Sequence, residues 1–171
     1  HGSAYRQHQD LIARLGDYGP RVVERISQLA RGGVVLEIGP GGGELLPDLA
    51  GLARQVIALD ASSEMLQQAE RHVRTSGNDT RNVRFVVGDT GAATGMQLPL
   101  ADAVMMNMVL HHTARPARVM ADVADLLAPG GTFVLTELCD HSQGEKAREV
   151  CGDVWPGFAP GQLTIWAEAA G

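Results

Sequence analysis

Five short apolar runs divide the chain, and longer stretches with apolar residues every three or four positions separate them. Apolar runs of this kind, closed by polar residues or glycine, are typical of strands buried on both faces of a parallel sheet. The predicted strands are 34–38, 55–59, 83–87, 103–109 and 132–138. The intervening stretches predict helices at 44–52, from Ser62 or Ser63 to about 74, and at 116–127, where Pro-Gly-Gly follows.

The segments that flank these strands are also expected to be helical. Apolar residues at helical spacing predict two helices within 4–31. After the last strand, the sequence predicts a helix near 143–152, a Trp-Pro-Gly-Phe loop and a closing helix at 161–170. Residues 1–3, His-Gly-Ser, resemble the remnant of a cloning tag and are left out of the fold prediction.

The alternation of strands and helices favours a doubly wound α/β fold with a mostly parallel, Rossmann-like sheet. Parallel strands need long crossover connections, and these are usually helices. The length of 171 residues and the 44% hydrophobic composition suit one domain of ordinary size. We therefore expect N-terminal helices in 1–32 and a single ligand-binding domain in 33–171.

Charge and composition narrow the range of partners. The formal charge is −6 and the basic residues are scattered, which argues against direct binding of nucleic acid. The longest apolar runs, such as 103–110, fall far short of the roughly 20 residues of a membrane helix, and no charged-then-apolar leader opens the chain. We expect a soluble, cytoplasmic protein without a membrane partner, in which Cys139 and Cys151 are reduced thiols.

A glycine-rich segment directly follows the first predicted strand. The sequence VLEIGPGGGELL, residues 35–46, places Gly39, Gly41 and Gly43 where a strand or helix would otherwise continue. Glycine has no Cβ, so such a loop can turn sharply and let a ligand lie against its backbone. A tight turn without a ligand is the alternative explanation.

The spacing within this loop distinguishes between ligands. A dinucleotide fingerprint needs a small residue at the position of Glu44, so a nicotinamide-dependent oxidoreductase is disfavoured. The pattern is instead E-x-G-x-G-x-G, beginning at Glu37. An acidic side chain in the loop suits a ligand that carries a cation better than one that carries a pyrophosphate.

Four motifs in order resemble those of the class I S-adenosylmethionine-dependent methyltransferases. They lie within 33–138 and are the Glu37 loop, Asp60 after the second strand, Gly88-Asp89 after the third, and LLAPGG before the fifth. The resemblance implies S-adenosyl-L-methionine as cofactor, with its methionine part held by Glu37 and by the backbone from Gly39 to Gly43.

The same resemblance implies roles for residues at the ends of the later strands. Asp60 would accept hydrogen bonds from the ribose hydroxyls, and Asp89 would lie near the adenine amino group. Asn107 and Met108 would border the methyl-transfer pocket. The implied cofactor site is completed by Ala61, Gly88 and Thr90.

The C-terminal half resembles one subgroup of this class. MVLHHTARPARVMADVADLLAPGGTFVLTEL and CGDVWPGF resemble the methyltransferase portion of proteins joined to ArsR-type winged-helix repressors, and more loosely the quinone-biosynthesis methyltransferases. Class I enzymes usually continue into a sixth and a seventh strand, whereas this sequence ends at Gly171. We therefore expect 132–138 to be an exposed sheet edge in a shortened chain, or an edge covered by a partner, for example in a homodimer.

Two adjacent histidines follow the fourth predicted strand. His111 and His112 are candidates for a general base because imidazole titrates near neutral pH, and His111, nearer the strand, is the predicted catalytic residue. Either ring could instead cap or pack. Cys139, Asp140 and His141, with Cys151 further on, could form a soft metal or arsenic site. Their spacing matches no standard zinc pattern, and such cysteines are more often small buried hydrophobes, so no metal site is expected.

These observations predict an S-adenosylmethionine-dependent methyltransferase that acts on an oxygen, carbon or sulfur atom of a small molecule. The alternative is a sensor that binds the cofactor and modulates a repressor without efficient catalysis. Trp155, Phe158 and Trp166 would either cover the methyl acceptor or belong to the core.

Overall fold

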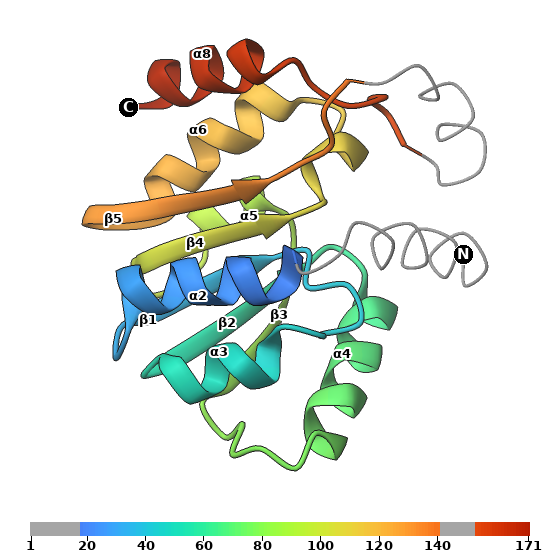
Figure 1. Ribbon diagram of the computed structural model, residues 1–171, viewed down its shortest axis with the longest axis vertical. Coiled ribbons are helices and arrows are strands. Elements are labelled where there is room, and N and C mark those ends of the chain that lie inside the picture. Colours follow the sequence, from blue (N-terminus) through green and yellow to red (C-terminus); the bar gives the residue numbers. More distant parts are fainter. Residues whose placement is uncertain (1–17, 141–152) are drawn as a thin grey trace.

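The computed structural model describes residues 18–140 and 153–171 of the chain (Figure 1). The helix predicted near 143–152 lies outside these ranges. The part of the predicted N-terminal helical region that precedes residue 18 also lies outside them.

A five-stranded sheet forms the centre of the molecule. Its strands are β1 (Val34–Ile38), β2 (Gln55–Asp60), β3 (Val83–Val87), β4 (Ala101–Asn107) and β5 (Leu127–Thr136). The order across the sheet is β3-β2-β1-β4-β5, and each neighbouring pair is parallel. The predicted α/β class and mostly parallel sheet are therefore confirmed.

Helices cover both faces of the sheet (Figure 1). One apolar core lies under α2 (Tyr18–Ala30), α3 (Leu46–Leu52) and α4 (Ser63–Thr75). The other core lies under α5 (Thr90–Thr94), α6 (Pro116–Leu126) and α8 (Pro160–Ala170). Burial on both faces explains why the strands are continuous apolar runs rather than alternating patterns.

Individual residues show how the two cores are formed. Side chains alternate along a strand, so Val35 of β1 enters the first core whereas Val34 and Leu36 enter the second. The predicted cap is also present, because the Ser62 hydroxyl accepts a hydrogen bond from the Met65 N–H at the start of α4.

Two predicted boundaries near the carboxyl ends of β1 and β4 are wrong by a few residues. β4 is Ala101–Asn107 rather than 103–109, because Met108 has a φ of 56° and leaves the strand conformation. α3 begins at Leu46 rather than at residue 44, because a turn precedes it in which the Gly43 N–H donates to the carbonyl of Pro40.

The start of β5 was predicted too late. The strand begins at Leu127 rather than at residue 132, so it includes the Pro-Gly-Gly segment that we expected to separate helix from strand. The pairing of β4 with β5 is irregular just after Ala101, and Gly130 there has a φ of 79°. A Cβ at Gly131 would lie 2.9 Å from the Ala101 carbonyl oxygen. Glycine permits this irregularity, and proline is tolerated on an edge strand.

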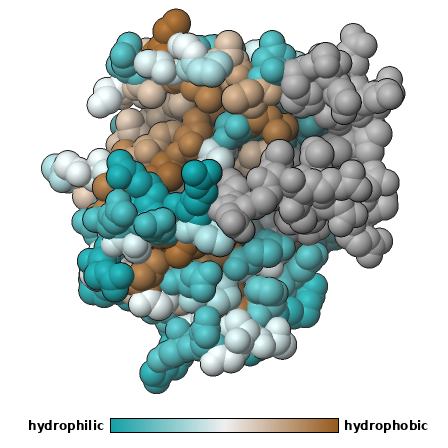
Figure 2. All heavy atoms as spheres, in the orientation of Figure 1, coloured by the Kyte–Doolittle hydropathy of each residue, from teal (hydrophilic) through white to brown (hydrophobic). Residues whose placement is uncertain are grey.

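β5 lies at one edge of the sheet, as predicted. Figure 2 shows apolar residues gathered along this side, between α2 and α8, and Ile165 of α8 is 65% exposed. None of the helices in the described ranges is long and apolar enough to cross a membrane. A partner or a second copy that covers this edge stays a prediction.

Candidate active site

The strand order reverses between β1 and β4: β2 and β3 follow on one side of β1, whereas β4 and β5 follow on the other. β1 pairs with β2 on one side and with β4 on the other. In open parallel sheets, the ligand crevice lies beyond the carboxyl ends of the strands at such a point. The predicted site residues all lie at or beyond the carboxyl ends of the first four strands: Glu37, Gly39, Gly41, Gly43, Asp60, Ala61, Gly88, Asp89, Thr90, Asn107, Met108 and His111.

The glycine loop is tightly packed against its surroundings. Gly39, Gly41 and Gly43 have φ values of 67°, 58° and 84°, a conformation that strongly favours glycine. A Cβ at Gly39 would lie 2.5 Å from the Val109 side chain, and one at Gly43 would lie 2.9 Å from Cα of Ala69 in α4. The backbone conformation and this close packing require glycine at positions 39 and 43, independently of any ligand.

Glu37 is a buried carboxyl group on β1, directly before this loop. Its exposed fraction is 2%, and its Oε2 atom is fully buried with no hydrogen-bond partner in the described part of the chain. Burial, and secondarily the negative charge of Glu44, raise the pKa of Glu37 to about 8. A positive charge or an N–H donor from a ligand would stabilise this carboxylate.

A second buried oxygen lies on the neighbouring strand. The Asn107 Oδ1 atom, at the end of β4, is also buried and has no hydrogen-bond partner among the residues that the structure describes. Ile38 of β1 is opposite Met106 of β4, so Glu37 and Asn107 lie on the two strands between which a ligand crevice is expected. Buried acceptors without partners are rare in folded proteins and call for an explanation such as a ligand. These two fit a ligand that brings N–H donors and positive charge.

Asp60 closes β2 on the other side of β1. The Ser62 backbone N–H donates to its Oδ1 at 2.8 Å, which fixes the side chain at the start of the following turn. Burial raises the pKa of Asp60, and the Ser62 hydrogen bond opposes this shift. The carboxylate is half-buried, so it can accept hydrogen bonds from a ligand at this edge.

The residues at the end of β3 already have hydrogen bonds within the protein. Asp89 is exposed, and its Oδ1 caps α5 by accepting from the Ala92 N–H at 2.7 Å. Thr90 is buried, and its hydroxyl donates to Asp122 of α6 at 3.0 Å. The role of Asp89 near an adenine and the role of Thr90 in the cofactor site stay predictions.

His111 is completely buried rather than open to the crevice. It lies in the short helix η1 (Leu110–His112), and its Nδ1 is 2.6 Å from Oε1 of Glu137. The backbone N–H of His111 donates to Oε2 of the same carboxylate at 3.1 Å, and the N–H of Leu138 donates to Oε1 at 2.7 Å. Glu137 therefore fixes both the ring and the backbone of His111.

Sequence reasoning missed two of the acidic residues around these histidines. Glu137 directly follows β5, and Asp153 lies in the CGDVWPGF stretch. Asp153 has an exposed fraction of only 6%, and its Oδ1 is 3.6 Å from Nε2 of His111. The available signal was a charged residue at the end of an apolar run, TFVLTEL, which is unusual for a buried strand end.

The aromatic residues near the C-terminus belong to the core. Phe158 is 1% exposed, and its ring lies 5.6 Å from that of Trp155 and 5.8 Å from that of Trp166. The Trp155 indole N–H donates to the carbonyl of Thr113 at 3.0 Å. Of the predicted alternatives, the structure supports packing rather than a lid.

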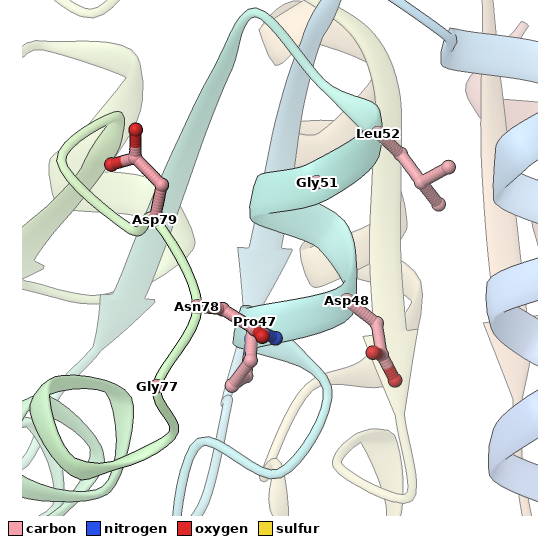
Figure 3. Close-up of a pocket in the computed structure, with 7 residues that line it drawn as sticks. All are labelled: Pro47, Asp48, Gly51, Leu52, Gly77, Asn78 and Asp79. Atoms are coloured by element: carbon pink, nitrogen blue, oxygen red, sulfur yellow. The ribbon is translucent and has the colours of Figure 1, made fainter.

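A surface pocket of about 530 Å³ lies elsewhere, on the outer side of α3 facing the loop between α4 and β3 (Figure 3). Its lining is formed by Pro47, Asp48, Gly51, Leu52, Gly77, Asn78 and Asp79. None of these residues belongs to the predicted site. Asp79 is paired instead with Arg81 at 2.7 Å, which lowers the pKa of this carboxyl.

A family model and curated relatives match the sequence of this chain. The family model for a methyltransferase domain matches residues 36–135. The ubiquinone biosynthesis O-methyltransferase of Xanthomonas axonopodis pv. citri is 34% identical over 107 residues, which are 63% of this chain and 44% of that protein. The chain thus spans less than half the length of this curated relative.

Solved structures share the fold. The YcgJ protein of Bacillus subtilis aligns with a TM-score of 0.76 at 20% identity, over 89% of this chain and 66% of that one. The methyltransferase CalH, solved in complex with S-adenosylhomocysteine, aligns with a TM-score of 0.68 at 22% identity, over 88% of this chain and 47% of that one. Because the family model covers more than half of the chain, and the parallel α/β fold is shared with solved methyltransferases, the protein belongs to the class I S-adenosylmethionine-dependent methyltransferases.

Proposed function

We propose that the protein transfers the methyl group of S-adenosylmethionine to a hydroxyl oxygen of a small aromatic molecule. The observation that carries the cofactor assignment is the pair of buried, unpartnered oxygens of Glu37 and Asn107 on the two strands that border the crevice. Support for an oxygen acceptor comes from the relative named as an O-methyltransferase of ubiquinone biosynthesis.

The proposed cofactor contacts follow from the positions of these residues. Glu37 and the loop backbone would hold the methionine part, whose ammonium and sulfonium charges suit a buried carboxylate. Asp60 would accept hydrogen bonds from the two ribose hydroxyls, and Asp89 would lie near the adenine. Asn107 and Met108 would border the acceptor.

The main task of the protein in this reaction is to position the cofactor and the acceptor. S-adenosylmethionine, when bound, supplies an electrophilic methyl carbon on a positively charged sulfur. Transfer of this methyl group to the acceptor oxygen would break the carbon–sulfur bond, leave its electron pair on the sulfur of S-adenosylhomocysteine, and require the hydroxyl proton to pass to a base or to water. An in-line arrangement and exclusion of water supply much of the acceleration.

The role of His111 as a general base stays a prediction. Its Nδ1 faces Glu137, so an acceptor proton could reach the ring only at Nε2, on the side of Asp153. His112 is the more accessible of the two rings, with 40% of its side chain exposed.

We expect Asp60→Ala to weaken S-adenosylhomocysteine binding at least tenfold. The substitution removes an acceptor of hydrogen bonds to a charged group, each worth about 1.5–3 kcal/mol. Calorimetry measures the affinity, and methyl transfer to a catechol at sub-saturating cofactor should fall in parallel.

Asp79→Ala is the matched control, because Asp79 is an exposed aspartate that lies away from the crevice. The affinity of the Asp79→Ala variant for S-adenosylhomocysteine and its turnover should equal those of the wild type. Equal cofactor affinity in Asp60→Ala would show that Asp60 does not contact the cofactor. Methylation of a thiol but not of a catechol would overturn the oxygen acceptor while leaving the cofactor site intact.

A further inference from the structure

Three potential metal ligands converge beyond the carboxyl end of β4. His111 and His112 belong to η1, and Asp153 lies in the segment that precedes α8. One ligand atom from each residue can be chosen so that all three lie within 4.8 Å of one another. The Asp153 Oδ1 atom is 3.6 Å from Nε2 of His111 and 3.3 Å from Nδ1 of His112.

Two of these separations are close to the edges of a tetrahedral metal site. Zinc binds imidazole nitrogen and carboxylate oxygen at about 2.0–2.1 Å, so two ligands of one tetrahedral ion lie about 3.3–3.4 Å apart. The two distances to Asp153 are close to this value. Two imidazoles and one carboxylate are also a ligand set that suits divalent first-row transition metals.

The orientation of His111 is set by a carboxylate, as in many metal sites. Nδ1 of His111 is 2.6 Å from Oε1 of Glu137, so this carboxylate occupies Nδ1 and Nε2 is the ring nitrogen on the side of Asp153. A carboxylate that holds the outer nitrogen of a histidine in this way orients the ring and raises its basicity as a metal ligand.

The backbone holds the two ligand-bearing segments together. The carbonyl of His111 accepts hydrogen bonds from the N–H groups of Val154 and Trp155, at 2.9 and 3.0 Å. Asp153 is therefore fixed beside η1 although the two segments are far apart in the sequence. The site is built by packing and hydrogen bonds rather than by a chance meeting of surface side chains.

The charge of the cluster also fits a cation. The side chains of Glu137 and Asp153 are only 1% and 2% exposed. Burying two carboxylates is costly unless positive charge balances them. A bound divalent ion would be one source of such positive charge.

We propose that His111, His112 and Asp153 form a binding site for one divalent transition-metal ion, with zinc as the reference ion. Glu137 orients His111 without binding the metal. Three protein ligands leave a fourth tetrahedral position, which an oxygen ligand such as water or a hydroxyl group would occupy. This proposal departs from the expectation that the chain has no metal site, which rested on the spacing of other residues.

Calorimetric titration of the chelator-treated, desalted full chain with zinc tests this proposal. We expect saturable binding of one ion per chain, and at least tenfold weaker binding by His112→Ala and by Asp153→Asn. His112 is partly exposed, so its replacement should leave the fold intact, and Glu137→Gln should weaken binding about 10–100-fold through the orientation of His111.

His72→Ala is the control, because His72 is an exposed histidine on α4. It should bind zinc as the wild type does. Cobalt gives a second measure, since a tetrahedral site produces a visible absorption band that His112→Ala should lose. Absence of saturable zinc binding in the wild type, or unchanged affinity in both His112→Ala and Asp153→Asn, would overturn the proposal and leave an acid–histidine cluster held by hydrogen bonds alone.

Discussion

Gly43→Ala is expected to destabilise the protein by roughly 2–5 kcal/mol and to weaken cofactor binding. Gly43 has a φ of 84°, which costs a residue with a Cβ about 1–2 kcal/mol. The added Cβ would lie 2.9 Å from Cα of Ala69, so the backbone of α4 would have to move, and overpacking of this kind costs about 1–3 kcal/mol. Urea unfolding followed by circular dichroism measures the loss.

Gly51→Ala is the matched control for this substitution. Gly51 lies within α3, and apart from its chain neighbours and the backbone of its own helix no atom lies within 4 Å of the position that its Cβ would take. Alanine is the better helix former, so this variant should gain about 0.5–1 kcal/mol. Equal stability of Gly43→Ala and the wild type would show that the glycine loop does not pack against α4 as described.

The free energy of unfolding of the ligand-free protein should fall as the pH rises toward 8. Glu37→Gln should remove the share of this loss that comes from ionisation of Glu37. The pKa of Glu37 is about 8 in the folded protein and 4.5 in an unperturbed carboxyl group. Between these values the unfolded chain loses its proton while the folded chain keeps it, so ionisation favours unfolding. The pKa difference corresponds to a loss of roughly 3–5 kcal/mol in the free energy of unfolding. The loss reaches its full size above the pKa of the folded protein.

The comparison of free energies of unfolding at pH 5 and pH 9 isolates this effect. The variant should be more stable than the wild type at pH 9 and nearly equal to it at pH 5, and Glu24→Gln, at an exposed position on α2, should follow the wild type throughout. A constant difference between wild type and Glu37→Gln across this range would contradict a buried, protonated Glu37. Binding of a cation beside the carboxylate should lower its pKa and release a proton.

The sheet could be predicted from the sequence because strands buried on both faces have a distinctive apolar pattern. The ends of β1 and β3 were located correctly, and Asp60 and Asn107 were placed at strand ends that the structure brings to one edge. The start of β5 was missed because its Pro-Gly-Gly segment has the composition of a turn. An edge strand with an irregular register tolerates these residues, which local propensity alone does not reveal.

The surroundings of His111 could not be predicted in the same way. Its contacts with Glu137 and Asp153 join segments that are distant in the sequence, and no local pattern encodes such a contact. The burial of the His111 side chain could not be predicted from the sequence either, because a histidine that follows a strand can point into the crevice or into the core. The structure places it in the core, fixed by Glu137.

The central claim is that the crevice between β1 and β4 binds S-adenosylmethionine. Calorimetric titration of the wild-type protein with S-adenosylhomocysteine, and separately with NAD, tests it most directly. We expect saturable binding of one S-adenosylhomocysteine per chain and no measurable binding of NAD. Binding of NAD without binding of S-adenosylhomocysteine would contradict it.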